Sequence, residues 1–152
     1  MKTVLIADVC ETSDMQALVV EGDMLLADAV RQFATNHDLR GIFLTGEDGH
    51  LTGVINKIDL LNWVSMQLDQ LPAGEPLGKG QMRRLLSAKR VADLAAAGSE
   101  EAAVRMDETV ADALRKMTYH GLADIPVVDG NGGIANDLRL SEILAYMLDT
   151  RP

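Results

Sequence analysis

The stretch Asp23-Met-Leu-Leu-Ala-Asp-Ala-Val-Arg-Gln-Phe33 decides the fold, because it returns 84 positions later as Asp107-Glu-Thr-Val-Ala-Asp-Ala-Leu-Arg-Lys-Met117 with five identities in eleven residues. Two neighbouring blocks recur in the same order. Residues 6–9 match residues 91–94 at a shift of 85, and residues 37–61 overlay residues 120–144 at a shift of 83. Three blocks in one order indicate an internal repeat. The two halves of the chain are therefore expected to share one fold.

Both halves begin with the same predicted elements. Asp23 is a candidate N-cap for a helix in the first half. Short apolar runs at 17–20 and 102–104 predict a strand before the helix of each half. The helices themselves are predicted from apolar residues at helical spacing, which are Leu26, Ala29, Val30 and Phe33 in the first half and Val110, Ala113, Leu114 and Met117 in the second.

Each half then continues with a hairpin and a last helix. Gly-, Asp- and Asn-rich turns separate the apolar runs 42–44 and 51–55 in the first half, and 125–128 and 134–138 in the second. Last helices are expected at 58–68 and 141–148. The predicted fold class is α+β, with the order strand, helix, strand, strand, helix in each half.

The predicted organisation is a first motif at 1–66, a linker at 67–90 and a second motif at 91–150. A half of about 65 residues would bury only about 60% of its chain surface, so the two motifs are expected to pack together with pseudo-twofold symmetry. The linker begins with residues that interrupt regular structure, Pro72, Gly74, Pro76 and Gly78. It continues into a basic run, Lys79, Arg83, Arg84, Lys89 and Arg90, which could contact ligand phosphates or an acidic partner, or form a solvated helix.

Composition excludes several classes of function. The 14 Lys and Arg against 23 Asp and Glu give a net charge of -9, which disfavours a nucleic-acid partner. The longest stretch without a charged residue is nine residues, Leu60 to Leu68, too short to cross a membrane. The single Cys10 cannot form an intrachain disulfide, so a cytoplasmic location is expected. No zinc spacing and no catalytic motif occurs, so neither a metal site nor an enzyme is expected.

One segment carries a family resemblance. Ala113-Leu-Arg-Lys-Met117 ends a predicted helix, Ile125-Pro-Val-Val-Asp-Gly130 follows, and a strand then leads into a helix with an early carboxylate. This order resembles the CBS domain, named after cystathionine beta-synthase, and the duplication resembles the tandem pair called a Bateman module. The resemblance implies a regulatory module that forms a homodimer and signals to a separate, unidentified effector protein. It also implies an adenine-containing ligand, such as AMP, ADP, ATP or S-adenosylmethionine, with no required cofactor.

The resemblance points to a ligand signature of Gly, two apolar residues, Ser or Thr, two variable residues and Asp. The first half carries it as Gly53-Val-Ile-Asn-Lys-Ile-Asp59. Asp59 would accept the ribose hydroxyls, Asn56 would replace the hydroxyl as a phosphate donor, and Lys57 adds a charge. Val20 and Ile42 are implied as apolar members of the same site. The alternative for Asp59 is a helix-start carboxylate that only stabilises the helix dipole.

The second half departs further from the signature. Asn136 replaces Gly, Arg139 takes the Ser/Thr place and Glu142 takes the Asp place. Arg139 and Glu142 are three residues apart at a helix start, so they can pair across the space that a ribose would need. One hypothesis is that this second cleft is self-filled or reads a different ligand. For Arg139 and Glu142 themselves, the favoured interpretation is a surface ion pair worth under about 1 kcal/mol. A degenerate CBS pair that only dimerises and binds no ligand is a second function, and an anion sensor that uses the basic linker is a third.

Overall fold

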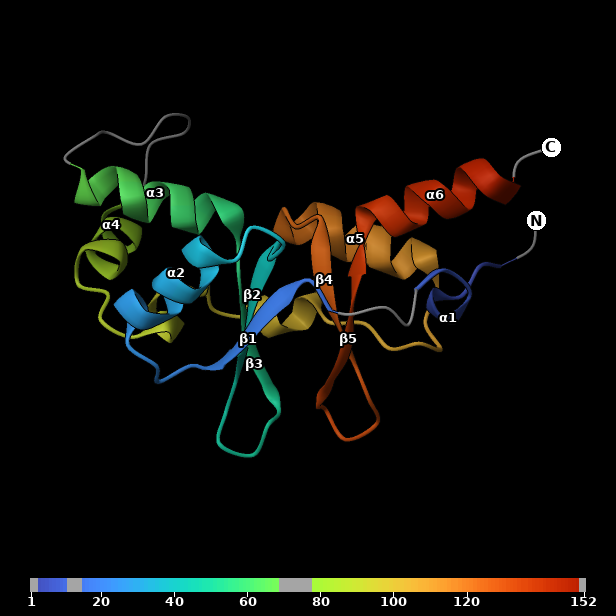
Figure 1. Ribbon diagram of the computed structural model, residues 1–152, viewed down its shortest axis with the longest axis horizontal. Coiled ribbons are helices and arrows are strands. Elements are labelled where there is room, and N and C mark those ends of the chain that lie inside the picture. The colour runs from blue at the N-terminus through green and yellow to red at the C-terminus, as the bar shows by residue number, and fades with distance from the viewer. Residues whose placement is uncertain (1–2, 11–14, 69–77, 151–152) are drawn as a thin grey trace.

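A computed structural model describes residues 3–10, 15–68 and 78–150 of the chain (Figure 1). The predicted residues Pro72, Gly74 and Pro76 lie outside these ranges. The elements follow in the order α1 (Ile6–Val9), β1 (Ala17–Glu21), α2 (Leu26–Thr35), β2 (Gly41–Thr45), β3 (Leu51–Ile55), α3 (Lys57–Gln67), α4 (Lys79–Leu86), the 3-10 helices η1 (Val91–Leu94) and η2 (Ser99–Ala102), α5 (Val110–His120), β4 (Asp124–Val128), β5 (Ile134–Arg139) and α6 (Leu140–Thr150). The α+β fold class is confirmed.

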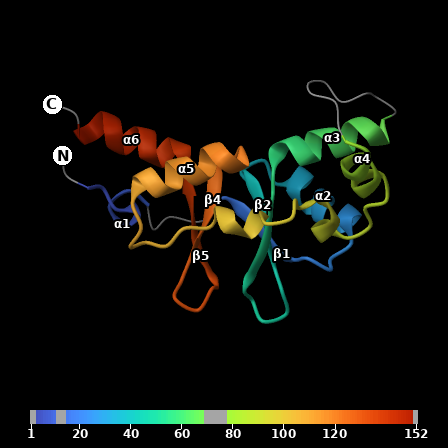
Figure 2. The same cartoon turned by 180° about the vertical axis from the view of Figure 1, so that it is seen from behind.

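The strands form two small sheets. In the first half β1 pairs parallel with β2, which pairs antiparallel with β3, and in the second half β4 pairs antiparallel with β5. Both predicted hairpins are confirmed. They lie side by side in the middle of the molecule (Figure 1), and the Leu51 amide donates to the Gly132 carbonyl at 3.1 Å near their tips. Seen from behind, α3 and α6 follow the edge opposite those tips (Figure 2).

The expected strand at 102–104 is wrong. The 3-10 helix η2 ends at Ala102, and only Val104 pairs with β4, in a single parallel bridge to Val127. The Val104 amide donates to the Pro126 carbonyl at 3.0 Å, and a turn closed by the Glu108 amide on the Arg105 carbonyl follows at once. A helix end before this residue and a turn after it leave room for one extended residue.

The two repeats exchange their first turns. The Ile6 amide of α1 donates to the Glu108 carbonyl at 2.9 Å, so α1 packs on the second half, beside α5 (Figure 1). In the equivalent contact the Val91 amide of η1 donates to the Met24 carbonyl at 2.9 Å, so η1 packs on the first half. Val91 and Leu94 complete the first apolar core, as α1 completes the second. Each core thus contains a turn from the other repeat.

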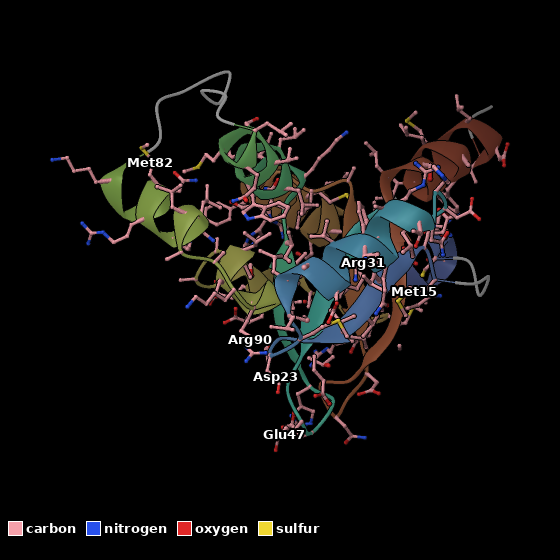
Figure 3. All side chains as sticks on the ribbon, turned by 60° about the vertical axis from the view of Figure 1, so that its left-hand side comes forward. Met15, Asp23, Arg31, Glu47, Met82 and Arg90 are labelled. Atoms are coloured by element: carbon pink, nitrogen blue, oxygen red, sulfur yellow. The ribbon has the colours of Figure 1, made fainter. Side chains whose placement is uncertain are left out.

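The predicted Asp23 cap of α2 is also wrong. Helix α2 begins after Leu25, without a side-chain cap. The Leu26 amide donates instead to the Lys89 carbonyl at 2.9 Å. Figure 3 shows Asp23 and Arg90 together at this junction, where the Arg90 guanidinium donates to the Asp23 carbonyl at 3.1 Å. The end of the linker therefore satisfies the helix start that a side chain was expected to cap.

Candidate functional site

A cavity of about 390 Å³ lies where the two halves and the linker meet. Helix α3 begins and helix α5 ends near the centre of the molecule (Figure 1). Four segments line the cavity: the end of β3 with the first turn of α3, the inner face of α4, the chain from Ala96 to Ser99, and residues 118–122 at the end of α5. The cleft predicted around Asn56 and Asp59 is therefore a cavity with walls from both repeats.

Gly53 allows the second half to approach β3 closely. A Cβ atom at this position would lie 3.2 Å from the Ala95 Cβ and 3.4 Å from the Ser99 Oγ. Next to it, the Val54 amide donates to the Ser99 hydroxyl at 3.0 Å. The glycine of the signature thus brings the segment before η2 against β3.

Asn56 connects the start of α3 to the end of α5. Its Oδ1 accepts from the Ile58 amide at 2.8 Å and caps α3, while its Nδ2 donates to the His120 carbonyl at 2.5 Å. The next residue, Gly121, ends α5 with a φ of 65°, and a Cβ there would lie 3.1 Å from the Asn56 Nδ2. One N–H of the amide therefore holds the two halves together and leaves the other for a ligand.

Asp59 is the buried acid of the cavity. It is 6% exposed, and burial raises the pKa of its carboxyl, while the Arg84 guanidinium opposes that rise. The Arg84 Nη2 lies 3.2 Å from the Asp59 Oδ1, and its Nη1 donates to the Leu94 carbonyl at 2.8 Å. The linker helix α4 therefore supplies the counter-ion of the predicted ribose acid.

Sequence reasoning named Arg84 only as a member of the basic run. The pair joins residues 25 positions apart, on either side of residues 69–77. No local pattern in the sequence singles out Arg84 from the other basic residues of the run. The members of the basic run differ in their surroundings, because Arg84 pairs with Asp59 in the cavity whereas Arg83 is exposed.

The other predicted residues of the first site lie outside the cavity lining. Lys57 is exposed as the first residue of α3. Val20 and Ile42 are buried in the apolar core of the first half, with Leu26 and Val91. Neither Val20 nor Ile42 lines the cavity.

In the second half, Arg139 and Glu142 form a buried pair. The Arg139 Nε lies 3.2 Å from the Glu142 Oε1, which also accepts from the Arg139 amide at 3.0 Å. Their side chains are 11% and 5% exposed, so the reading as a surface ion pair is wrong. Asn136 is buried beside them, and its Oδ1 accepts from the Asp137 amide at 2.9 Å. The signature residues of this half bond to one another.

Two further buried carboxyls adjoin this pair, and sequence reasoning missed both. Asp124 is 6% exposed and Asp137 is fully buried, and among the described residues the hydrogen-bond partner of each carboxyl is the other carboxyl. Burial and a hydrogen bond with Asp137 raise the pKa of Asp124 to about 9. The repeat could have indicated these two carboxyls. At the shift of 83, Asp124 aligns with Gly41 and Asp137 aligns with Val54, so each acid stands where the first half has an uncharged residue.

Cys10 closes the same cluster. Its Sγ donates to the Asp137 carbonyl at 3.4 Å, and burial, with the charges of Glu142 and Asp137, raises the pKa of the thiol to about 11.

Among residues 3–10, 15–68 and 78–150, no group of three or more His, Cys, Asp and Glu side chains is arranged to hold a metal ion. Over the same ranges, no helix is both long and apolar enough to cross a membrane.

Comparisons with known proteins follow this geometry. The family model of the CBS domain matches the chain twice, at residues 6–66 and 91–149. A CBS domain-containing protein from Thermotoga maritima is 24% identical, with 99% of each chain covered and a TM-score of 0.76. CBSX2 in complex with AMP is 19% identical, with 96% of this chain and 97% of that chain covered and a TM-score of 0.68.

A third solved structure is the CBS domain pair of protein MJ0100 in complex with 5′-methylthioadenosine and S-adenosyl-L-methionine. It is 15% identical, with 99% of this chain and 100% of that chain covered and a TM-score of 0.65. No curated protein sequence matches the chain significantly. Two matched repeats, packed against each other in one fold, assign this chain to the CBS domain family as a tandem CBS pair.

Proposed function

We propose that this chain is a regulatory module that binds an adenine nucleotide or adenosyl compound in the cleft of Asn56 and Asp59. The observation that carries the proposal is the cavity of about 390 Å³ with the buried Asp59 carboxylate on its wall. Ligand sites commonly have volumes of about 300–1,000 Å³ and a few placed polar groups. The AMP complex of CBSX2 and the adenosyl complex of protein MJ0100 support this ligand class.

The regulatory role follows from the walls of the cleft. Asp59 belongs to the first half, Arg84 to the linker helix, and Ser99 and His120 to the second half. A ligand that contacts all of them biases how the three parts sit against one another. We propose that a separate effector protein in the cytoplasm reads this change, and that the chain itself performs no catalysis.

Thermal unfolding with AMP, ADP, ATP and S-adenosylmethionine tests the proposal. A ligand at 100 times its dissociation constant adds about 2.7 kcal/mol of stability. Asp59→Asn keeps the shape of the side chain and loses the charge, so it should remove most of this gain. Glu142→Gln makes the equivalent change in the second half and should keep it. If no nucleoside compound stabilises the parent chain, or if Asp59→Asn responds like the parent, the proposed site is wrong.

A purely structural dimerisation module is the second candidate, and exposed apolar side chains favour it. They lie along two helices on one edge of the molecule (Figure 2): Ile58, Leu61, Val64 and Leu68 on or directly after α3, and Leu140, Leu144, Met147 and Leu148 on α6. We propose that a second copy of the chain covers this surface. Sedimentation of the parent and of Leu61→Lys tests it, and a dimer that no tested ligand binds would favour the structural candidate.

A further inference from the structure

We infer that Arg84 makes the cleft selective for a ligand with an anionic group, a nucleoside phosphate, over an uncharged nucleoside or a cationic adenosyl compound. This inference rests on the proposed function and narrows its ligand class. Its basis is the position of the guanidinium, which lies on the wall of the cavity within reach of the buried acid.

Arg84, on α4, is held in place by contacts to two other elements. Its Nη2 donates to Asp59 of α3 at 3.2 Å, and its Nη1 donates to the Leu94 carbonyl at 2.8 Å and weakly to the Asp93 carbonyl at 3.5 Å, both at the end of η1. Its side chain is 27% exposed. The positive charge is therefore fixed at the cavity rather than free to move into solvent.

The guanidinium keeps donors for a ligand. An arginine side chain has five N–H groups in a planar fork, and the contacts to Asp59 and to η1 use only part of them. A phosphate group accepts from such a fork in pairs, with roughly twice the strength of a neutral hydrogen bond. Arg84 can thus hold Asp59 for the ribose and bind a phosphate in the same complex.

The other polar groups of the cleft leave Arg84 as its cationic donor. Among the described lining residues, Asp59 is the acid and Arg84 the arginine, and they are paired with each other. The remaining polar lining residues include Asn56, Gln81 and Ser99, which are neutral. Because Asp59 offsets much of the charge of Arg84, the preference rests on direct contact with the remaining N–H groups of the guanidinium, which attract a phosphate and repel an ammonium or sulfonium group.

The test compares AMP with adenosine, S-adenosylmethionine and inorganic phosphate, by titration calorimetry on the full chain. We expect AMP to bind about ten- to a hundred-fold more tightly than adenosine, the range for a hydrogen bond between charged groups. In Arg84→Gln this ratio should fall to within about three-fold, with adenosine still bound. Arg83→Gln, on the exposed neighbour in the same helix, should keep the ratio of the parent.

Each outcome decides a separate question. A parent chain that binds adenosine or S-adenosylmethionine as tightly as AMP overturns the inference and leaves the proposed function standing, whereas a chain that binds no adenine compound refutes the proposed function itself. If Arg84→Gln binds neither AMP nor adenosine, Arg84→Lys, which keeps the positive charge, must bind AMP more tightly than adenosine. A preference for AMP that persists in Arg84→Gln overturns the inference, and so does inorganic phosphate that binds as tightly as AMP.

Discussion

Asp124→Asn is expected to reduce the loss of stability as the pH rises. Burial and the hydrogen bond with Asp137 raise the pKa of Asp124 to about 9, and the nearby charges are those of Asp137, Arg139 and Glu142. The folded chain therefore holds a proton that the unfolded chain releases near pH 4. The stabilisation is complete below about pH 4 and is lost progressively as the pH rises towards about 9.

The size of the effect follows from proton linkage. One proton held only by the folded state lowers the free energy of unfolding by about 1.4 kcal/mol for each pH unit. Between pH 5 and pH 7 this amounts to at most about 2.7 kcal/mol, because the pKa of about 9 already includes the opposing effect of Arg139. Asparagine has no proton to lose in this range and still offers an N–H to Asp137, so the variant lacks this slope.

Urea unfolding at pH 5, 6, 7 and 8 measures the difference directly. The free energy of unfolding of Asp124→Asn, minus that of the parent, should rise with pH over this series. Asp38→Asn, which changes an exposed carboxylate, should follow the parent at every pH. Parallel curves for Asp124→Asn and the parent would refute the shared proton at Asp124.

Two further predictions concern buried positions. The pKa of Cys10, raised from 9.0 to about 11, means roughly a hundred-fold less thiolate, so a thiol reagent at pH 8 should modify the folded chain far more slowly than the urea-unfolded chain. Equal rates would place the thiol in solvent. Gly53→Ala should lower the free energy of unfolding by about 1–3 kcal/mol in chemical denaturation, because its Cβ would lie 3.2 Å from the Ala95 Cβ. Gly80→Ala, in the first turn of α4, where an added Cβ would meet no neighbouring segment within 4 Å, should instead raise the free energy of unfolding by up to about 1 kcal/mol. The same sign for both variants would contradict the close approach at Gly53.

The repeat and the apolar periodicities predicted most of the fold because they express local physics. Apolar residues at helical spacing, such as Leu26 and Ala29, predict both the helix and the face of it that is buried. The hairpin turns are predicted from the Gly, Asp and Asn residues that they contain. The two errors have different causes. At Asp23 a distant segment replaced the local cap, because the Lys89 carbonyl accepts from the Leu26 amide at the start of α2. At 102–104 local structure replaced the strand, because η2 ends at Ala102 and a turn begins at Arg105, which leaves Val104 as one extended residue.

Only those residues of the site that belong to a local sequence pattern could be predicted. Asn56 and Asp59 were identifiable because the signature is a local run of seven residues with one glycine and one acid. Arg84 was not identifiable as their partner, because the path from α3 to α4 passes through residues 69–77, whose course no periodicity predicts. The carboxyls Asp124 and Asp137 were missed for another reason, since a lone Asp on a hairpin is ordinarily exposed.

The two clefts should bind unequally, with one nucleotide for each chain. Val54, 2% exposed, gives the first cleft an apolar wall, and the repeat places Asp137 at the matching position of the second half. In the second cleft, a purine at this position would lie against a cluster of carboxyls and remove water from them. Removing water from polar groups costs several kcal/mol unless new hydrogen bonds replace those lost. Arg139 is the basic side chain of this cluster, and its Nε lies 3.2 Å from the Glu142 Oε1 and 3.9 Å from the Asp137 Oδ2, so a ligand would compete with both carboxyls for the guanidinium. Titration with AMP should therefore give a stoichiometry near one, and two equal sites for each chain would show that the buried carboxyls do not close the second cleft.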